Sequence, residues 1–221
     1  MFETIAPPPN RLIVFARLPE AGKVKTRLAR DLGDDRALAV YQAMLRDLFA
    51  NLGASTEELD IEILWAPTEA ANGAALHAAF NGYPLAMQTG DTLGDRLCMA
   101  FSERFFFQRT QKVVAIGADE PALTRALIDD AFNLLESVDW VVGPASDGGY
   151  YLIGCRAAAF DPAIFDGIDW GSDRVLAQTL AKIRTTVAML PLRNDIDVID
   201  DLRAYAGGGA LAALLQEWEL R

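Results

Sequence analysis

The sequence predicts an α/β fold in which a mostly parallel β-sheet carries helices on both faces. Short apolar runs alternate along the chain with longer segments whose apolar residues recur every three or four positions. The first pattern is typical of buried strands and the second of amphipathic helices. Their alternation predicts a parallel sheet covered on both faces. Because no internal repeat or low-complexity linker interrupts the pattern, we expect one domain over residues 10–221 after a loose leader at residues 1–9.

The strand predictions rest on runs of branched and aromatic residues bounded by turn-forming residues. The predicted strands are residues 11–16, 60–67, 83–88, 112–119, 139–145, 150–155 and 187–192. The pair 139–145 and 150–155 flanks the short loop SDGG. A loop of this length predicts one antiparallel or irregular excursion within the sheet.

The helix predictions rest on apolar spacing and on capping residues. The predicted helices are residues 34–53, 68–80, 91–108, 123–137, 172–186 and the two sides of the Gly207–Gly209 break in residues 200–221. Thr68 and Thr124 are predicted N-caps, and Gly53 is a predicted helix end. His77, the single histidine, falls within one of these helices, where we expect it to have a core or surface role.

Composition excludes several classes of function. The formal net charge of −11 argues against non-specific nucleic-acid binding, which needs a basic surface. A lone histidine and two isolated cysteines, Cys98 and Cys155, argue against zinc sites, histidine-based triads and a disulfide scaffold. The chain shows neither a signal-peptide pattern nor an apolar run of bilayer length. These features predict a soluble cytoplasmic protein without a membrane span.

One stretch of this acidic chain is strongly basic. In residues 17–30, Arg17, Lys23, Lys25, Arg27 and Arg30 stand against Glu20 alone. The stretch follows the first predicted strand, and ligands of open α/β sheets bind beyond the carboxyl ends of strands. It is not a Walker A loop, since Val24 follows Gly22-Lys23, and it holds no G-x-G-x-x-G pattern. The cluster predicts a phosphate-binding loop; the alternative is a solvated loop that pairs with surface acids.

Acidic residues follow two other predicted strands. Asp119 and Glu120 come directly after strand 112–119, where a carboxylate could hold Mg²⁺. Asp195 and Asp197 alternate with Ile196, so both carboxylates could point to the same side. The alternatives are a turn residue before a proline for Asp119 and an acidic helix start for the second pair.

Two further polar loops are candidate sites. In GPASDGGYYLIG, Asp147 could bind a hydroxyl or act as a base, and Gly148 and Gly149 permit close approach of a ligand. The alternative is an ordinary hairpin turn. In QTGDTLGDRL, Asp91 and Arg96 open a helix, and Asp91 could simply be its N-cap.

Five motifs together resemble a known family. LIVFARLPEAGKVKTRLA, GDTLGDRL, IGADEPALT, GPASDGGYYLIG and DIDVIDDL are similar, in this order, to a bacterial glycosyltransferase family of the nucleotide-diphospho-sugar transferase superfamily. Some of its members are linked to arsenosugar biosynthesis. The resemblance covers about residues 11–202. It implies a single-domain, three-layer α/β/α sandwich of the glycosyltransferase-A type.

The resemblance also implies roles for individual residues. The nucleotide and its phosphates would lie against the first loop, which holds Ala16, Arg17, Pro19, Gly22, Lys23, Lys25 and Arg27. Asp119 would bind Mg²⁺ or Mn²⁺, with Asp197 as a second ligand. Asp91 and Arg96 would lie near the nucleoside, and the second substrate would lie near Asp147, Gly148, Gly149 and Tyr150. The chain departs from the family pattern at Glu120 and at Val198-Ile199.

The chemistry remains open among three hypotheses at this point. The first is a metal-dependent glycosyltransferase that uses a nucleotide sugar and a small-molecule acceptor. The second is a nucleotidylyltransferase that joins a nucleoside triphosphate to a phosphorylated metabolite, because Gly117 stands where a D-x-D motif would have its first acid. The third is a non-catalytic nucleotide-binding module. For either enzyme, Asp119, Asp147 and Lys25 are the predicted catalytic residues. In all three, the apolar C-terminal helix after the Gly207–Gly209 break could form a dimer contact or pack on the protein's own sheet.

Overall fold

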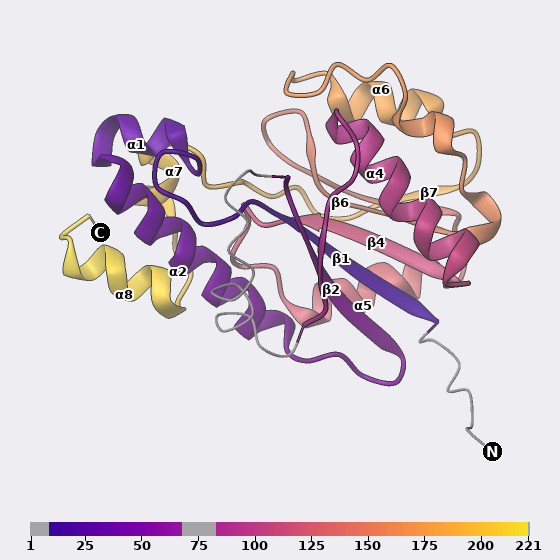
Figure 1. Ribbon diagram of the computed structural model, residues 1–221, viewed down its shortest axis with the longest axis horizontal. Helices are drawn as coiled ribbons and strands as arrows, with labels where there is room; N and C mark the ends of the chain where they lie inside the picture. Colours follow the sequence, from indigo (N-terminus) through magenta and orange to yellow (C-terminus); the bar gives the residue numbers. More distant parts are fainter. Residues whose placement is uncertain (1–8, 68–82, 221) are drawn as a thin grey trace.

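The fold is organised around one twisted sheet (Figure 1). The computed structural model describes residues 9–67 and 83–220. The predicted helix 68–80, with Thr68 and His77, and the leader before Pro9 lie outside these residues. Within the described residues the sheet has seven strands in the order β3-β2-β1-β4-β6-β5-β7. The strands are β1 (Asn10–Ala16), β2 (Leu59–Trp65), β3 (Leu85–Met87), β4 (Lys112–Gly117), β5 (Trp140–Pro144), β6 (Tyr150–Arg156) and β7 (Val187–Met189).

The strand directions confirm the predicted α/β class. β6 is antiparallel to both of its neighbours, β4 and β5. All other pairings are parallel. The loops after β1, β4, β5 and β7 therefore leave the same edge of the sheet, and β6 begins at that edge.

Helices complete the layers. They are α1 (Thr26–Leu32), α2 (Asp34–Leu52), α4 (Leu93–Ser102), α5 (Arg125–Leu134), α6 (Val175–Lys182), α7 (Ile199–Ala204) and α8 (Gly209–Glu217). A π-helical turn, Glu103–Phe107, extends α4, and 3₁₀ turns occupy Ala157–Ala159 and Pro162–Phe165. Thr124 caps α5 as predicted, because its side chain accepts from the N–H of Leu127.

Two local details differ from the sequence-based expectations. The basic stretch 17–30 is a loop only as far as Lys25, and α1 follows it. This helix escapes pattern analysis because it is short and only Leu28 in it is buried. The N-cap of α4 is Thr92 and not Asp91, since Thr92 and Asp95 form a reciprocal capping box.

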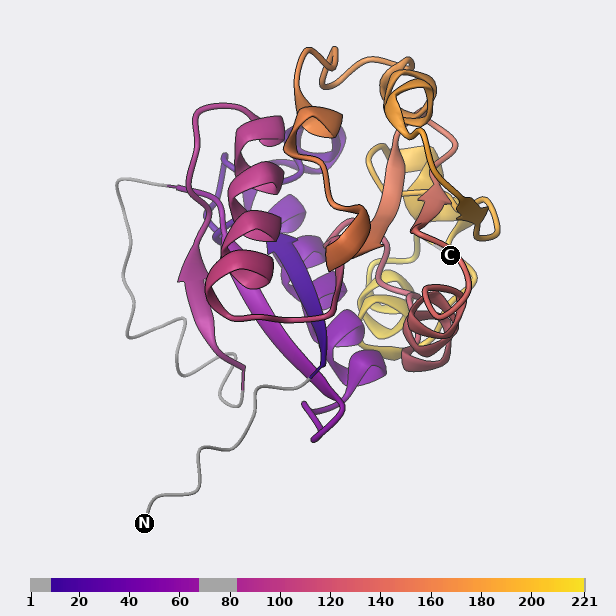
Figure 2. The same cartoon turned by 90° about the vertical axis from the view of Figure 1, so that its right-hand side faces the viewer.

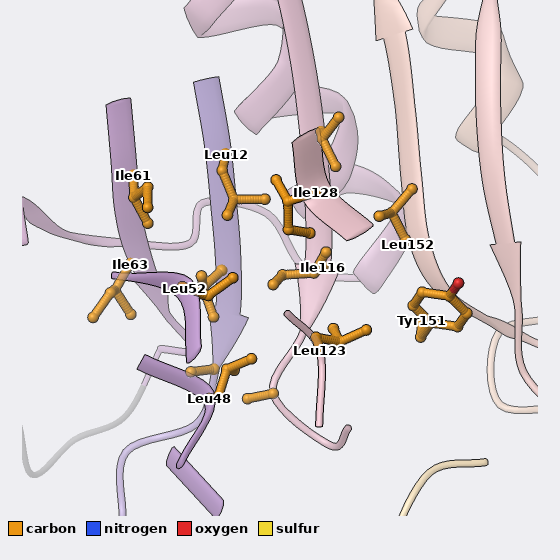
Figure 3. Packing of buried hydrophobic residues seen from close by; sticks show 14 of the residues in the cluster. Leu12, Leu48, Leu52, Ile61, Ile63, Ile116, Leu123, Ile128, Tyr151 and Leu152 are labelled. Atoms are coloured by element: carbon orange, nitrogen blue, oxygen red, sulfur yellow. The ribbon is translucent and has the colours of Figure 1, made fainter. Parts of the chain in front are cut away.

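One face of the sheet packs against α2 and α5. The side chains of Leu12, Ile61 and Ile116 point from three neighbouring strands toward Leu48 of α2 and Ile128 of α5 (Figure 3). All five are fully buried or nearly so. The opposite face, which carries the alternate residues of each strand, packs against α4, the 3₁₀ turn Pro162–Phe165 and, at its margin, α6.

A third cluster extends the core beyond α2. Val40 and Met44 of α2 pack with Leu211 and Leu215 of α8, while α1 and α7 complete this cluster. Both views show α8 beside α2 and away from α4 (Figures 1 and 2). The buried Ile196 belongs to the same cluster, which anchors the segment before α7 beside α1 and α2.

Over the described ranges, no helix combines the length and the apolar character needed to cross a bilayer.

Candidate functional site

A cleft of about 760 Å³ lies at the carboxyl edge of the sheet. It is lined by the loop after β1, the loop after β4, the start of β6 and the segment before α7. Its charged residues are Arg17, Lys23, Lys25, Arg27, Arg96, Asp119, Glu120, Asp195 and Asp197. The basic and acidic stretches that the sequence predicted separately therefore face one another across a single cavity.

Lys25 is at the centre of these charges. Its Nζ lies 2.6 Å from Oδ1 of Asp119 and 3.2 Å from Oδ1 of Asp197. It also donates to the main-chain oxygen of Ile196. Only 3% of the side chain is exposed. Burial by itself disfavours the charged form, but the two carboxylates outweigh it and raise the pKa of Lys25, so the ammonium group stays charged.

The backbone of the first loop is held by a residue of α2 that sequence analysis did not single out. Tyr41 of α2 accepts from the N–H of Arg17 and donates to its carbonyl oxygen, at 2.9 and 3.1 Å. Burial first, and the charge of Asp119 second, raise the pKa of the Tyr41 hydroxyl. The only sequence signal was a tyrosine at an apolar helix position. Lys25 itself has φ 46°, a left-handed conformation that sets the start of α1.

The cations of the loop differ in how strongly they are held. Lys23 pairs with Glu20 at 2.7 Å, and 58% of its side chain is exposed. Arg27 is 66% exposed, with its guanidinium 3.6 Å from Oδ2 of Asp197. Neither pair is buried, so Lys23 and Arg27 can reorient toward a ligand at small cost.

The acidic residues around the start of α7 differ in what they contact. Ile196 packs into the core, and the alternation of side chains in extended backbone turns Asp195 and Asp197 toward the cleft. Asp201 accepts from the N–H groups of Asp197 and Val198, each at 2.9 Å. Asp201 therefore fills the helix-start role that was considered for this acidic cluster. The carboxylates of Asp195 and Asp197 remain available to the cleft.

Crowding of negative charge is strongest at Asp195. Burial, followed by the charges of Asp119 and Asp147, raises the pKa of its carboxyl group to about 7. Asp119 and Asp197 lie 2.6 and 3.2 Å from the ammonium group of Lys25, and their side chains are 50% and 43% exposed.

The donor set fits a hard divalent cation that shares its shell with a ligand. Asp119 and Asp197 offer carboxylate oxygens to one ammonium group, so a cation already occupies the space between them. Within the part of the chain that the structure describes, no three His, Cys, Asp or Glu side chains group closely enough to form a metal cage by themselves. One or two carboxylates plus substrate phosphates is the usual arrangement for Mg²⁺.

Glu120, which departs from the family pattern, contacts its own loop and the segment after β7. Its carboxylate accepts from the N–H of Ala122 at 2.9 Å and lies 3.4 Å from the guanidinium of Arg193. The residue is 7% exposed. The contact with Arg193 ties the loop that carries Asp119 to the segment that leads to Asp197.

The loop between β5 and β6 is a tight turn that packs against the region before α6. Asp147 accepts from the N–H of Gly149 at 2.8 Å. Gly148 has φ 88°, and a Cβ there would lie 2.2 Å from the carbonyl oxygen of Asp173. Glycine is therefore required at position 148, because φ is positive and because a Cβ would clash with Asp173. Tyr150 lines the cleft, and its ring meets Trp170 edge-on at 6.4 Å.

The remaining predicted residues divide between the cleft and its surroundings. Ala16 and Arg96 line it, together with Ala66, Pro67 and Gln88, which sequence analysis did not single out. Arg96 donates to the carbonyl oxygens of Gly90 and Asp91. The predicted residues that do not line the cleft are Pro19, Gly22, Asp91, Asp147, Gly148 and Gly149.

Solved structures extend these observations. A protein of Desulfovibrio desulfuricans, provisionally named a nucleotide-diphospho-sugar transferase, shares 33% sequence identity, covers 96% of both chains and superposes with a TM-score of 0.90. A cytidylyltransferase of Leptospira borgpetersenii shares 12% identity at a TM-score of 0.55, covering 96% of this chain and 95% of its own. A Mycobacterium tuberculosis protein in complex with manganese shares 16% identity at a TM-score of 0.51, covering 89% of this chain and 97% of its own. The last two likenesses concern the fold alone.

Sequence comparison assigns the family. No curated protein sequence matches the chain. A family model described as "Uncharacterized protein conserved in bacteria (DUF2064)" matches residues 50–172. Together with the D. desulfuricans relative, this match confirms the predicted resemblance and the predicted fold class. The chain therefore belongs to the DUF2064 family of bacterial proteins, built on the nucleotide-diphospho-sugar transferase fold.

Proposed function

We propose that the protein is a divalent-metal-dependent glycosyltransferase that uses a nucleotide-diphospho-sugar as donor. One observation carries the proposal: the cleft sets exposed cations opposite two half-exposed carboxylates at the carboxyl edge of the sheet. A nucleotide diphosphate needs both, because its phosphates are anionic and are commonly bridged by a metal ion. The similarity to the D. desulfuricans protein supports the choice of donor.

The cations of the cleft would bind the diphosphate. Arg17, Arg27 and Arg96 line the cavity, and Lys23 lies at its rim with a largely exposed side chain. Guanidinium groups suit phosphates because they donate in a planar fork. These side chains would stabilise the charge that develops on the departing diphosphate when the bond between sugar carbon and oxygen breaks.

Asp119 and Asp197 would hold Mg²⁺ or Mn²⁺. A bound ion of this kind supplies Lewis-acid stabilisation of negative charge on phosphate oxygens. The manganese complex of a protein with the same fold supports this assignment. Asp119 and Asp197 would hold the ion at the end of the cleft where the loop after β4 meets the segment before α7.

The second substrate would bind on the β6 side of the cleft. Tyr150, at the start of β6, presents its ring there. Asp147, Gly148 and Gly149 form the adjoining turn, which we propose as the neighbouring wall for a small hydroxylated acceptor. The rigid packing of Gly148 against Asp173 would hold this wall in place.

Nucleotidyl transfer is the second candidate, favoured by one sequence observation. Gly117 stands two positions before Asp119, so the site has a single acid where a D-x-D motif has two. Fold likeness to a cytidylyltransferase is compatible with this chemistry. The same cations and carboxylates would then act on the α-phosphate and the departing pyrophosphate.

Product analysis tests and separates these proposals. Purified protein is incubated with Mn²⁺ and a panel of nucleotide sugars, and separately with nucleoside triphosphates plus phosphate esters. We expect slow release of nucleoside diphosphate from one nucleotide sugar, lost in Asp119→Asn. Ester-dependent pyrophosphate release would support nucleotidyl transfer instead. Metal-independent binding without turnover of any compound would contradict both and leave a binding module.

A further inference from the structure

We propose that the ammonium group of Lys25 is a built-in counter-ion at the candidate metal site, so that a divalent cation binds together with the nucleotide's phosphates and not before them. The inference rests on the proposed function, because it takes Asp119 and Asp197 as the metal's carboxylates. It revises the role expected for Lys25, from a permanent phosphate ligand to a group that changes partners.

The contacts of Lys25 account for its whole donor capacity. An ammonium group has three N–H donors. One is given to Asp119, one to Asp197 and one to the carbonyl oxygen of Ile196. With 3% of its side chain exposed, Lys25 is held in this position by the surrounding structure. No donor of Lys25 is left for a phosphate while these contacts last.

The same contacts obstruct a metal ion. A divalent cation bound between Asp119 and Asp197 would take the oxygens that the ammonium now uses. It would also lie within a few ångströms of a like charge in a partly buried site, where repulsion is strong. For the nucleotide-free protein, metal binding therefore requires that Lys25 first give up two ion pairs.

The nucleotide removes this obstacle. Phosphate oxygens are strong acceptors for an ammonium group. A diphosphate in the cleft gives Lys25 new partners and gives the metal the ligands that two carboxylates do not supply. The site has no third acidic or histidine ligand grouped with them among the described residues, so its shell stays incomplete without the phosphates. Metal and nucleotide should therefore bind with positive coupling.

Manganese binding without turnover tests the proposal. The EPR signal of free Mn²⁺ reports binding to nucleotide-free protein. With cytidine or uridine diphosphate, tested in turn, the loss of signal is compared with that caused by the same diphosphate without protein. We expect weak Mn²⁺ binding to the wild type alone and tighter binding with the diphosphate. Lys25→Met should tighten Mn²⁺ binding to the nucleotide-free protein by about tenfold, within the usual range of coupling between ligands. An unchanged or weaker affinity in this variant would overturn the proposal.

Two further variants make the result specific to this lysine. Arg30→Met removes the same charge from the same basic stretch, but Arg30 does not line the cleft. We expect its Mn²⁺ affinity to match the wild type; an equal gain would show a general charge effect and contradict the proposal. Adding Asp119→Asn to Lys25→Met should abolish the gain.

A measurement on the wild type covers the case in which Lys25→Met fails to fold. With ¹⁵N-labelled lysine, the ammonium signal of the buried Lys25 can be followed by NMR. We expect Mg²⁺ alone to leave it unchanged and Mg²⁺ with the diphosphate to shift it. A full shift with Mg²⁺ alone, or none with both, would overturn the inference. Failure of every protein to bind Mn²⁺, even with nucleotide, would instead overturn the proposed function as well.

Discussion

Two clusters of ion pairs in this protein each place a buried cation against carboxylates, but they differ in the exposure of their acids. Arg104, from the turn after α4, forms a bidentate pair with Glu62 of β2 at 2.6 and 2.7 Å, and the side chains are 3% and 6% exposed. In the cleft, Lys25 is equally buried, but Asp119 and Asp197 are 50% and 43% exposed.

This difference separates a structural ion pair from a candidate binding site. The carboxylate of Glu62 is enclosed by Arg104 and, at 3.7 Å, by Arg11. Its side chain is 6% exposed, so a ligand from solvent does not reach it. The carboxylates around Lys25 are half exposed and line the cleft, so a ligand that enters it can compete with Lys25 for them. A buried cation is thus a weak indicator of function, whereas half-exposed acids around it are an informative one.

The largest expected effect is on the enclosed pair. Arg104→Met should lower the free energy of unfolding by about 3–5 kcal/mol, because it leaves Glu62 buried without its main partner. Urea denaturation measures this loss. Adding Glu62→Leu should restore much of the stability, since no buried charge then remains. A loss below 1 kcal/mol in the single variant would show that solvent reaches Glu62 and would break the comparison.

The second effect concerns the open cluster. Asp119→Asn should reduce turnover by about 10²–10³-fold, the range for removing one group that stabilises transition-state charge. The free energy of unfolding should fall by less than in Arg104→Met, because Asp197 and the carbonyl oxygen of Ile196 still accept from the buried Lys25. Asp129→Asn is the matched control, because Asp129 is also 50% exposed and paired with Arg125, but on α5. Equal activity of the two variants would contradict the role of Asp119.

The third effect separates cations inside the cleft from those outside it. Arg27→Ala should weaken nucleotide binding by about 1.5–3 kcal/mol, the range for hydrogen bonds to charged groups. Arg30→Ala changes the same charge on the next turn of α1, but Arg30 does not line the cavity. Calorimetric titration of both variants measures the difference. Similar affinities would mean that the basic stretch acts only through its overall charge.

The smallest effect belongs to an ion pair near the surface. Hydrogen bonds from Arg156 first, and then from Thr186, lower the pKa of the Asp139 carboxyl from 3.8 to about 2. The lowered pKa means that its contribution to stability is present above pH 3.8 and is lost as the pH falls toward 2. Asp139→Asn should flatten this part of the pH dependence of thermal unfolding. An unchanged acid limb in this variant would contradict the prediction.

Much of the fold could be predicted from local patterns. The alternation of apolar runs and amphipathic segments predicted β1, α2, β4 and α5, because buried strands and two-sided helices have different periods. Thr124 was identified as a cap because its side chain acts on its own helix. The helix α1 was missed because a single buried leucine has no period, and the cap of α4 was misplaced by one residue, from Thr92 to Asp91.

Sequence patterns predicted only part of the candidate site. The rule that ligands bind beyond the carboxyl ends of strands selected the loops that hold Lys25, Asp119 and Asp197. Tyr41 was not singled out for the site, because its contact with Arg17 spans 24 positions. The contact of Glu120 could not be predicted either, since its partner Arg193 lies 73 positions away in the sequence.

The sequence by itself determined the fold class, the family and the charged stretches from which a site could be built. These depend on neighbours along the chain and on motif order, which need no coordinates. Only the tertiary structure decided that the ammonium of Lys25 lies between Asp119 and Asp197, and that those acids, unlike Glu62, stay open to the cleft. Charge pairing and solvent exposure are properties of residues brought together across long sequence separations, and they follow from the packing of the whole sheet.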